Sequence, residues 1–413
     1  MNRLILIGNG FDLAHGLQTH YEDFIKWYWR EWGNQLHLSH KSEEEDRFCS
    51  FKLHNTSADW FNALYYLYQI VNPLKPFDAL KMVEQIKQNH VLCDFSIKSP
   101  FFQKICDEVT LNTKKWVDIE DIYYSFLKSG IAPQQVNDDL EYLKIKLIEY
   151  LGSLPNTSIN PIIKNQILAP FSKEDIAIGS MDLWKAEIKN RLNYKDDEWE
   201  RLLVGYNPKG TKQYSVSTIQ YYKTKYTIDF LSDNFNSINE KMCPAFYLPD
   251  NIMMLNFNYT NTADMYFPRV EKFSVIHIHG SLSNPESIIF GYGDERDDEY
   301  EALIKKNDNE YLRHIKSFHY LESFNYRKML EFIELGPYQV CIMGHSCGIS
   351  DRTLLCTLFE HPNCVSIKPY YYQKDDGTDN YFDLVCSIAR NISDPRLMRD
   401  RVVRKERCEA LGC

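Results

Sequence analysis

The feature that most constrains the fold is a short apolar run that stops on two glycines. Leu4 to Ile7 are all apolar, and Gly8-Asn9-Gly10, Phe11 and the acid Asp12 follow at once. A continuous apolar run, without polar residues at every second position, is typical of a strand buried on both faces of a parallel sheet. A single strand has no backbone hydrogen-bonding partner of its own, so partner strands are expected elsewhere in the chain.

These partner strands are predicted towards the other end of the chain. Short apolar segments occupy residues 252–258, 274–280, 287–291, 338–344 and 364–372, and helical patterns separate several of them at 261–267, about 310–335 and 352–360. Strands that alternate with helices are typical of β-α-β units and of a mostly parallel sheet. We therefore predict an α/β fold with a Rossmann-like, mostly parallel sheet, built from residues 1–35 and 245–413.

The segment between these two parts, residues 36–244, is predicted to be a large, mainly α-helical insertion domain. Helical periodicity runs through residues 60–71, 79–88, 119–129 and 138–151, with polar loops between them. An amphipathic helix over residues 21–32 precedes the insertion, with Thr19 as its N-cap and Glu22 as the capping-box partner. Asp118 and Asp121 are placed to cap the helix at 119–129.

Composition narrows the classes of function. The net charge of −10 produces no overall positive field that would attract the phosphate backbone of a nucleic acid. We interpret the one basic run, Arg396 to Arg407, as a solvated helix face or tail rather than an arm that binds nucleic acid. The N-terminus lacks a signal-peptide pattern, and no window reaches the roughly 18 apolar residues that a membrane span needs. We expect a cytoplasmic protein whose 11 cysteines are free thiols without a structural zinc site and which binds no membrane; its charge disfavours nucleic acid as a partner.

Polar groups and glycines follow each predicted strand. The candidate residues are Gly8, Asn9, Gly10, Phe11 and Asp12 after the first strand, and Asn256, Asn258, Thr260, His279, Gly280, Gly293, Gly344 and Ser346 after the later ones. Because the carboxyl ends of parallel strands meet at one edge of a sheet, where such folds bind ligands, we expect these residues to form one nucleotide site. His279 is suited to act as a general base, since imidazole titrates near neutral pH.

Each of these residues also has a structural interpretation that the sequence leaves open. The two glycines fit a tight turn without a ligand, Asp12 fits an N-cap, and Asn258 fits an Asx-turn or an N-cap. His279 fits a structural histidine at a strand end, and His277 fits a hydrogen-bonded core residue. These two histidines are spaced to chelate a metal, but no third ligand is evident nearby, so no metal site is predicted.

Several blocks of the sequence together resemble the AbiH family of bacteriophage abortive-infection proteins. They are LILIGNGFDLAHGLQTHYEDF from Leu4, LNFNYTNT from Leu255, HIHGSL from His277, IIFGYGDE from Ile288 and IMGHSCGISD from Ile342, with a weaker match at Trp116-Val117-Asp118-Ile119-Glu120. The resemblance implies a role in bacterial defence against phage. It also implies a phage-derived or co-encoded trigger protein as a partner, and self-association stays open.

The same pieces are similar, more distantly, to the sirtuin-type NAD-binding fold. Asn258 matches the asparagine of that family's central block, and His279 matches its catalytic histidine. Asn256 replaces a threonine of the block, Thr260 replaces an aspartate, and the four-cysteine zinc module is absent. The resemblance therefore implies hydrolysis of NAD to nicotinamide and ADP-ribose rather than protein deacylation, with NAD as substrate or ligand and no prosthetic group.

This hypothesis gives the candidate residues distinct roles. Gly8 and Gly10 cradle the pyrophosphate, and Gly344 and Ser346 line the adenosine side. Asn258 orients the nicotinamide ribose or a water, His279 accepts a proton, and Asp12 binds a ribose hydroxyl or stabilises developing positive charge. Ser350 caps the helix that follows. An enzyme of this kind must be gated, and the helical insertion is the expected gate. Two other functions stay open: a sensor that binds the nucleotide without consuming it, and a toxin that acts on nucleic acid. The sequence does not distinguish NAD from NADP or another nucleotide.

Overall fold

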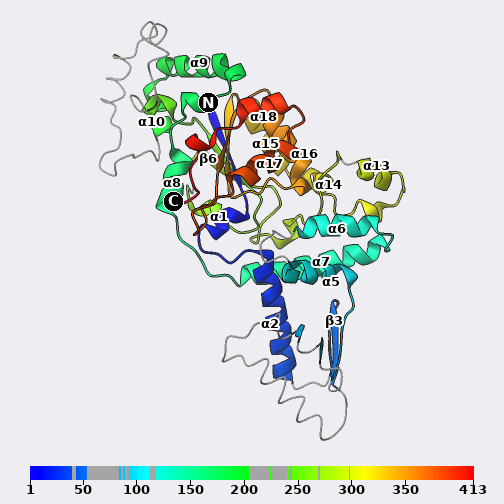
Figure 1. The fold of residues 1–413 in the computed structure, drawn as a ribbon. Helices are drawn as coiled ribbons and strands as arrows, with labels where there is room; N and C mark the ends of the chain where they lie inside the picture. Colours follow the sequence, from blue (N-terminus) through cyan, green and yellow to red (C-terminus); the bar gives the residue numbers. More distant parts are fainter. Residues whose placement is uncertain are drawn as a thin grey trace.

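A computed structural model gives the arrangement of the chain (Figure 1) and describes residues 1–39, 43–53, 83–84, 87–88, 93–111, 118–203, 224, 240, 244–267, 270–296 and 298–413. The strands are β1 Asn2–Ile7, β2 Glu43–Glu45, β3 Cys49–Leu53, β4 Cys93–Ile97, β5 Ile252–Asn256, β6 Phe273–His277, β7 Tyr338–Met343 and β8 Cys364–Tyr370. The α-helices are α1 Asn9–Leu13, α2 Tyr21–Ser39, α5 Pro100–Leu111, α6 Ile119–Lys128, α7 Pro133–Gly152, α8 Pro161–Leu168, α9 Met181–Asn190, α10 Asp196–Leu203, α13 Asp298–Ile304, α14 Lys316–His319, α15 Asn325–Glu334, α16 Arg352–Glu360, α17 Tyr381–Arg390 and α18 Pro395–Arg401.

The central element is a five-stranded sheet in the order β6-β5-β1-β7-β8, and all of its strands are parallel. The N-terminal strand β1 lies in the middle, where Leu4 is aligned with Met253 of β5 on one side and with Val340 of β7 on the other. This confirms an α/β fold in which the first strand pairs with strands from the far end of the chain. The carboxyl ends of all five strands lie at one edge.

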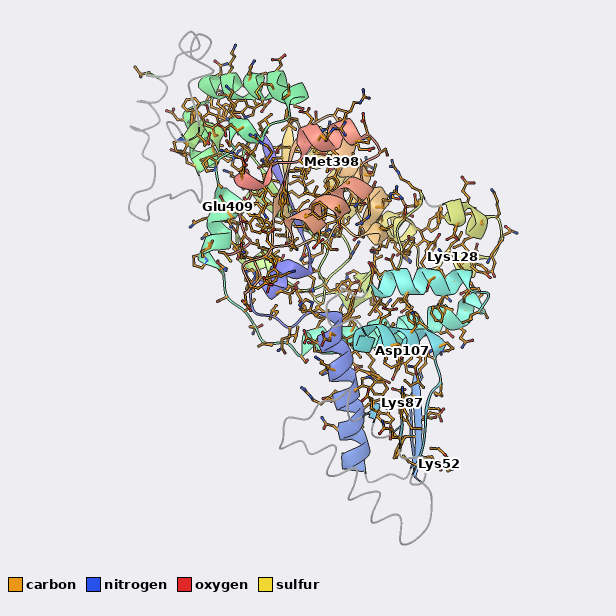
Figure 2. The ribbon with its side chains drawn as sticks, in the orientation of Figure 1. Lys52, Lys87, Asp107, Lys128, Met398 and Glu409 are labelled. Carbon is orange, nitrogen blue, oxygen red and sulfur yellow. The ribbon has the colours of Figure 1, made fainter. Side chains whose placement is uncertain are left out.

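Burial on both faces of the sheet explains the continuous apolar run. Ile5 and Ile7 pack on one face against side chains of α8, α9 and α10. Leu4 and Leu6 pack on the other face against side chains of α15, α16 and α17. Each of these side chains stabilises the fold by about 1.5–3 kcal/mol relative to leaving it in water. Figure 2 shows side chains filling the space on both sides of the strands.

A second core joins α2 and side chains around Tyr292 to the segment predicted as the insertion. Aromatic side chains of α2, β3, α5, α6 and α7 pack together in it, and Phe48, the residue before β3, stacks on Phe102 of α5 at 4.2 Å between ring centroids. In Figure 1, α2 and β3 extend side by side away from the parallel sheet. The described part of this segment contains a three-stranded antiparallel sheet, β2-β3-β4, as well as helices, which the prediction of a mainly helical insertion missed. The predicted helix at 60–71 lies outside the described residues, as does most of the one at 79–88.

Three elements at the carboxyl edge differ from the prediction. Residues 287–291 are not a strand: Pro285–Ser287 form a short 3₁₀ helix, and a single backbone bond, from Ile289 N to His279 O, replaces a ladder. The helix predicted at 261–267 is only a 3₁₀ turn at Ala263–Met265. The long helix predicted at about 310–335 is broken into α14 and α15 with 3₁₀ turns beside them, because Ser323 adopts an extended backbone between them.

Helix capping follows the prediction at one helix and not at another. Asp118 caps α6, and its side chain accepts hydrogen bonds from the backbone N–H groups of Glu120 and Asp121 at 3.0 and 3.2 Å. Thr19 does not cap α2: its buried hydroxyl has no hydrogen-bond partner among the described residues. In the described part of the chain, none of the helices has both the length and the apolar character needed to cross a bilayer.

Candidate functional site

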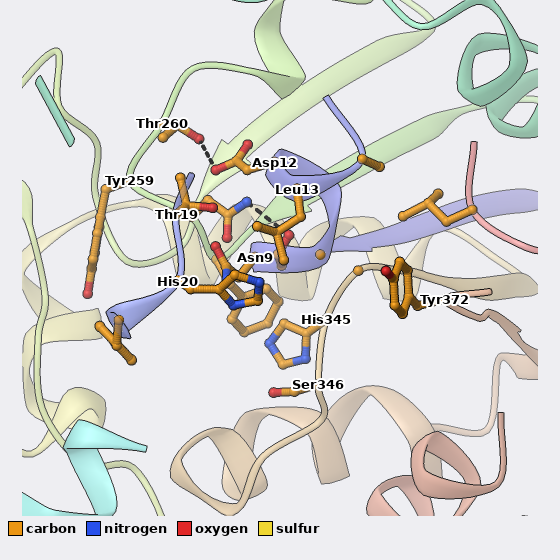
Figure 3. Close-up of a pocket in the computed structure, with 18 of the residues that line it drawn as sticks. Asn9, Asp12, Leu13, Thr19, His20, Tyr259, Thr260, His345, Ser346 and Tyr372 are labelled. Carbon is orange, nitrogen blue, oxygen red and sulfur yellow. Dashed lines mark hydrogen bonds between the residues drawn. The ribbon is translucent and has the colours of Figure 1, made fainter. Parts of the chain in front are cut away.

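A cavity of about 650 Å³ opens at the carboxyl edge of the parallel sheet (Figure 3). Its walls come from the loops after β1, β5, β6, β7 and β8, and from α6 and α7. The lining includes Asp118 and Glu120 of the capped α6 start, together with Leu147 and Leu151 of α7. The segment predicted as an insertion therefore forms part of the same cavity as the strand ends.

Nine of the residues predicted for the site line this cavity, and four do not. The nine are Gly8, Asn9, Gly10, Asp12, Asn258, Thr260, His279, Gly344 and Ser346; the four are Phe11, Asn256, Gly280 and Gly293. Each of the four has a structural role in the fold. Ser350, predicted as a helix cap, lines the cavity but makes no side-chain cap, and Asp351 is the residue that precedes α16.

The four residues outside the cavity shape the loops behind it. Phe11 is fully buried and packs against the rings of His15 and Tyr266. Asn256 is buried and closes its own loop, since its amide donates to Thr260 O at 3.0 Å and its Oδ1 accepts from Asn258 N at 3.0 Å.

Gly280 and Gly293 are glycines because the backbone approaches them closely. A Cβ on Gly280, which has φ of +80°, would lie 2.1 Å from Ser287 O, and a Cβ on Gly293 would lie 2.6 Å from Ser350 O. Both positions therefore serve packing.

The glycines at the start of the chain hold two loops together. Gly10 N–H donates to Gly344 O at 2.8 Å, and a Cβ on Gly8 would lie 2.4 Å from the Cα of His345. Gly344 has φ of +82°, and a Cβ there would lie 2.1 Å from the N atom of Phe11. The Gly10 N–H is thus already used within the protein, which differs from the predicted role of this group in binding a pyrophosphate.

A cluster of polar side chains surrounds Asp12. This residue lies inside α1 and not at the N-cap of the helix. Thr260 donates its hydroxyl to Asp12 Oδ2 at 2.6 Å, as Figure 3 shows, and Asn258 donates its side-chain amide to Gly8 O at 3.0 Å. Burial raises the pKa of Asp12, although Thr260 and Thr262 oppose this shift. Asp12 Oδ1 and Asn9 Nδ2 are buried without a hydrogen-bond partner among the described residues. An unpaired buried group costs about 1–3 kcal/mol, which a ligand that pairs with it would recover.

His279 lines the cavity and is only 4% exposed. Its Nε2 lies 3.1 Å from Tyr320 Oη and 3.3 Å from Asp351 Oδ1. Burial, and next the positive charge of Lys316, lower the pKa of His279, so the imidazole is neutral at physiological pH. His277 is hydrogen-bonded as predicted, to Asp264 at 2.9 Å and to Asn256 at 3.3 Å, but it is partly exposed and does not line the cavity.

A buried cluster of charges supports this histidine. Lys316 Nζ lies 2.7 Å from Glu120 Oε2 and 2.8 Å from Asp351 Oδ1, and all three side chains are buried. Burial alone would lower the pKa of Lys316, but the two carboxylates hold it above its ordinary value. Burial opposes ionisation of Asp351 too, yet Lys316 and His279 hold its pKa well below the usual range.

The pKa of Glu120 differs from that of Asp351, although both carboxyl groups contact the same lysine. Burial raises the pKa of Glu120 to about 8, because one lysine offsets the charge of one carboxylate and leaves the second without full compensation. Asp121 follows the same pattern, with a pKa of about 7 caused by burial and by Asp118. The cluster therefore combines an ionised Asp351 with a Glu120 that keeps its proton at neutral pH.

Sequence reasoning missed four residues of the site: Glu120, Lys316, His345 and Asp351. Three of them stand within the blocks quoted above, where His345 and Asp351 follow β7 and Glu120 ends the aromatic–acidic block. Lys316 carried no signal, because a lysine in a segment with a helical pattern is normally on the solvated face. Lys316 is the first residue of α14, and its backbone N–H donates to Tyr292 O at 2.9 Å.

The comparisons with known proteins agree with this arrangement at the level of the family. A family model described as bacteriophage abortive infection AbiH matches residues 4–372, which is most of the chain. The chain belongs to the AbiH family. The match includes most of β1, all the strands from β2 to β8 and every site residue described above. Neither the curated proteins nor the solved structures contain a match to it. The family indicates a role for this AbiH protein in abortive infection, that is, in defence against bacteriophage.

Proposed function

We propose that this AbiH protein hydrolyses NAD at the cavity and releases nicotinamide and ADP-ribose. The observation that carries the proposal is the meeting, in one cavity, of the neutral imidazole of His279, the side-chain amide of Asn258 and the buried carboxyl of Asp12. A dinucleotide fits a cavity of about 650 Å³, which is within the usual range for small-molecule sites.

The topology supports a nucleotide at this place. When the five parallel strands are counted in chain order, the sheet reads 3-2-1-4-5, an order that is found in doubly wound sheets. The order reverses between β1 and β7. Ligands of such sheets bind at this reversal point, and the cavity lies there.

The chemistry asks for few catalytic groups. When the bond between the ribose and nicotinamide breaks, its electron pair moves onto the ring nitrogen and neutralises the pyridinium, so the leaving group needs no proton and no metal. A water forms the new bond to the anomeric carbon and gives its proton to His279. Asn258 orients this water or the ribose, and the carboxyl of Asp12 binds a ribose hydroxyl or offsets the developing positive charge.

Asn258 is held for such a role. Its amide nitrogen donates to Gly8 O, while in the described part of the chain its amide oxygen accepts no hydrogen bond. That oxygen is free to accept from a water or a hydroxyl. Since Gly10 N–H is already paired, the phosphates and the adenosine would contact the side chains of Asn9 and Ser346, which line the cavity.

The test is to incubate the purified protein with NAD and to follow nicotinamide by chromatography. We expect release by the wild type and at least about 10-fold slower release by Asn258→Ala, because an oriented hydrogen-bonding group is lost. Asn261→Ala is the matched control, since Asn261 lies in the same loop but pairs with Ser283 at the surface. Binding of NAD without nicotinamide release, in purified form and in phage-infected cells, would instead identify a sensor.

The pH dependence gives an independent expectation. The reaction needs neutral His279, and burial lowers its pKa below the ordinary value of 6.5. The value of kcat/KM should therefore stay constant as the pH falls from about 8 through 6.5. It should decrease only at lower pH, where His279 takes up a proton. Rates between about pH 5 and about pH 9 check this, with circular dichroism to show that the fold persists. A rate that follows a group with a pKa of about 8 would point to Glu120 in place of His279.

A further inference from the structure

Asp351 occupies the centre of the residues behind the cavity. Its Oδ1 lies 2.8 Å from Lys316 Nζ and 3.3 Å from His279 Nε2, and its Oδ2 lies 3.5 Å from His345 Nε2. The side chain is about one-tenth exposed, and all three partners are buried. A single carboxylate thus faces a lysine and both buried histidines of the site.

The ionised state of Asp351 dictates where the two histidines carry their protons. A carboxylate only accepts hydrogen bonds, so each imidazole that pairs with it must present an N–H. His345 offers a second constraint, because its Nδ1 accepts the backbone N–H of Cys347 at 2.9 Å and so must be unprotonated. Both observations require His345 to carry its proton on Nε2, where it faces Asp351.

The hydrogen bonds of the two histidines also show which imidazole can accept a proton. The lone pair on Nδ1 of His345 is occupied by the Cys347 N–H. Nε2 of His279 points towards Asp351 and Tyr320, whereas its Nδ1 has no hydrogen bond to any described residue. His279 is therefore the histidine of this pair with a free lone pair.

We propose that Asp351 is the positioning residue of the site: it fixes His279 as the Nε2–H tautomer and leaves Nδ1 as the atom that accepts a proton. The catalytic consequence of this inference rests on the proposed NAD hydrolysis, but the tautomer does not. Lys316 keeps Asp351 ionised, and Glu120 links this arrangement to α6. The ring of Phe257 packs between the two imidazoles, 5.2 Å from His279 and 4.1 Å from His345, and restricts both rings.

The charged groups around His279 give the direction of its titration. Lys316 of α14 lowers its pKa, Asp351 raises it, and His345 lowers it when protonated. Tyr320 keeps its proton, because burial raises the pKa of that hydroxyl far above the physiological range. Removing the charge of Asp351 should therefore move the titration of His279 to still lower pH.

The first experiment records nitrogen–proton correlation spectra of the protein with ¹⁵N-labelled histidine, without any nucleotide. His279→Gln and His345→Gln assign the two signals. We expect both imidazoles as Nε2–H tautomers in the wild type at neutral pH. In Asp351→Asn only one side-chain atom accepts a hydrogen bond, so at least one imidazole should lose this tautomer. Nδ1–H on His279 in the wild type, or unchanged signals in a folded Asp351→Asn protein, would overturn the proposal.

The second experiment measures turnover. Asp351→Asn should lower kcat for NAD by about 100-fold with little change in KM, as expected for loss of a group that orients a catalytic histidine. The acidic limb of its pH–rate profile, where the rate falls as His279 takes up a proton, should also move to lower pH. Asp308→Asn, an exposed cap of a short turn, is the control. An equal loss of kcat without a shift of the acidic limb would mean a purely structural role. If the wild type does not hydrolyse NAD, the proposed function fails, and the tautomer measurement still decides on Asp351.

Should Asp351→Asn fail to fold, His345→Gln keeps the inference testable. This change replaces the imidazole donor on Asp351 by an amide donor and leaves Lys316 and His279 in place. We expect His279 to stay in the Nε2–H form in this variant. A switch of His279 to Nδ1–H would show that His345, and not Asp351, sets the tautomer, and would overturn the proposal.

Discussion

Replacing His279 with glutamine is expected to slow nicotinamide release from NAD by about 100- to 10,000-fold, the usual contribution of a general base. Glutamine is close in size to histidine and its amide N–H groups can replace the Nε2–H that faces Asp351 and Tyr320. The fold and the buried cluster should therefore persist. Only the basic lone pair is lost, so kcat should fall while the affinity for NAD changes little.

The assay is single-turnover nicotinamide release with a parallel binding measurement. His319→Gln serves as the control, because His319 lies on the same short helix as Lys316 but pairs with Glu322 at the surface. A full rate in His279→Gln with normal NAD binding would exclude His279 as the base. A loss that appears only in KM would mean that the imidazole binds the substrate and does not take its proton.

The residues at the site are of two kinds: those that the sequence predicts and those that only the structure brings there. Gly8, Asp12, Asn258 and His279 were predictable, because each lies within five residues of the end of a strand, and parallel strands bring their carboxyl ends to one edge. The parallel sheet itself was predictable from the apolar run at Leu4 to Ile7. Local pattern and one topological rule were enough for these features.

The supporting residues depend on contacts that no local pattern encodes. Glu120 and Lys316 are 196 positions apart and meet only because α6 packs beside the strand ends. Lys316 also lies where a continuous helix was predicted, and the break near Ser323 is set by the tertiary fold. Asn256, a polar residue at a strand end, was predicted as a ligand group; in the fold it closes a loop and does not line the cavity.

A second large effect is expected from Lys316→Met, which should lower the free energy of unfolding by about 3–5 kcal/mol. The substitution keeps the volume of the side chain but removes the cation between Glu120 and Asp351. Asp351 would then be a buried carboxylate without a compensating charge. Urea unfolding of the variant and of Lys305→Met measures the effect; Lys305 is 75% exposed and pairs with Glu301, so its loss should cost less than about 1 kcal/mol.

The pH dependence of this loss separates charge from packing. In the wild type the pKa of Asp351 is lowered, so its stabilising contribution is present above the unfolded value near 3.8 and is lost only as the pH falls through its lower folded value. Without Lys316 the folded pKa of Asp351 rises above the unfolded value, and the folded state then binds a proton that the unfolded state has released. The deficit should therefore be larger at about pH 8 than at about pH 5. The triple variant Glu120→Gln, Lys316→Met and Asp351→Asn removes all three ionisable side chains and should recover part of the loss. If it unfolds as easily as Lys316→Met, and the deficit is the same at both pH values, the lysine stabilises the fold through packing and the charge balance proposed for the site is wrong.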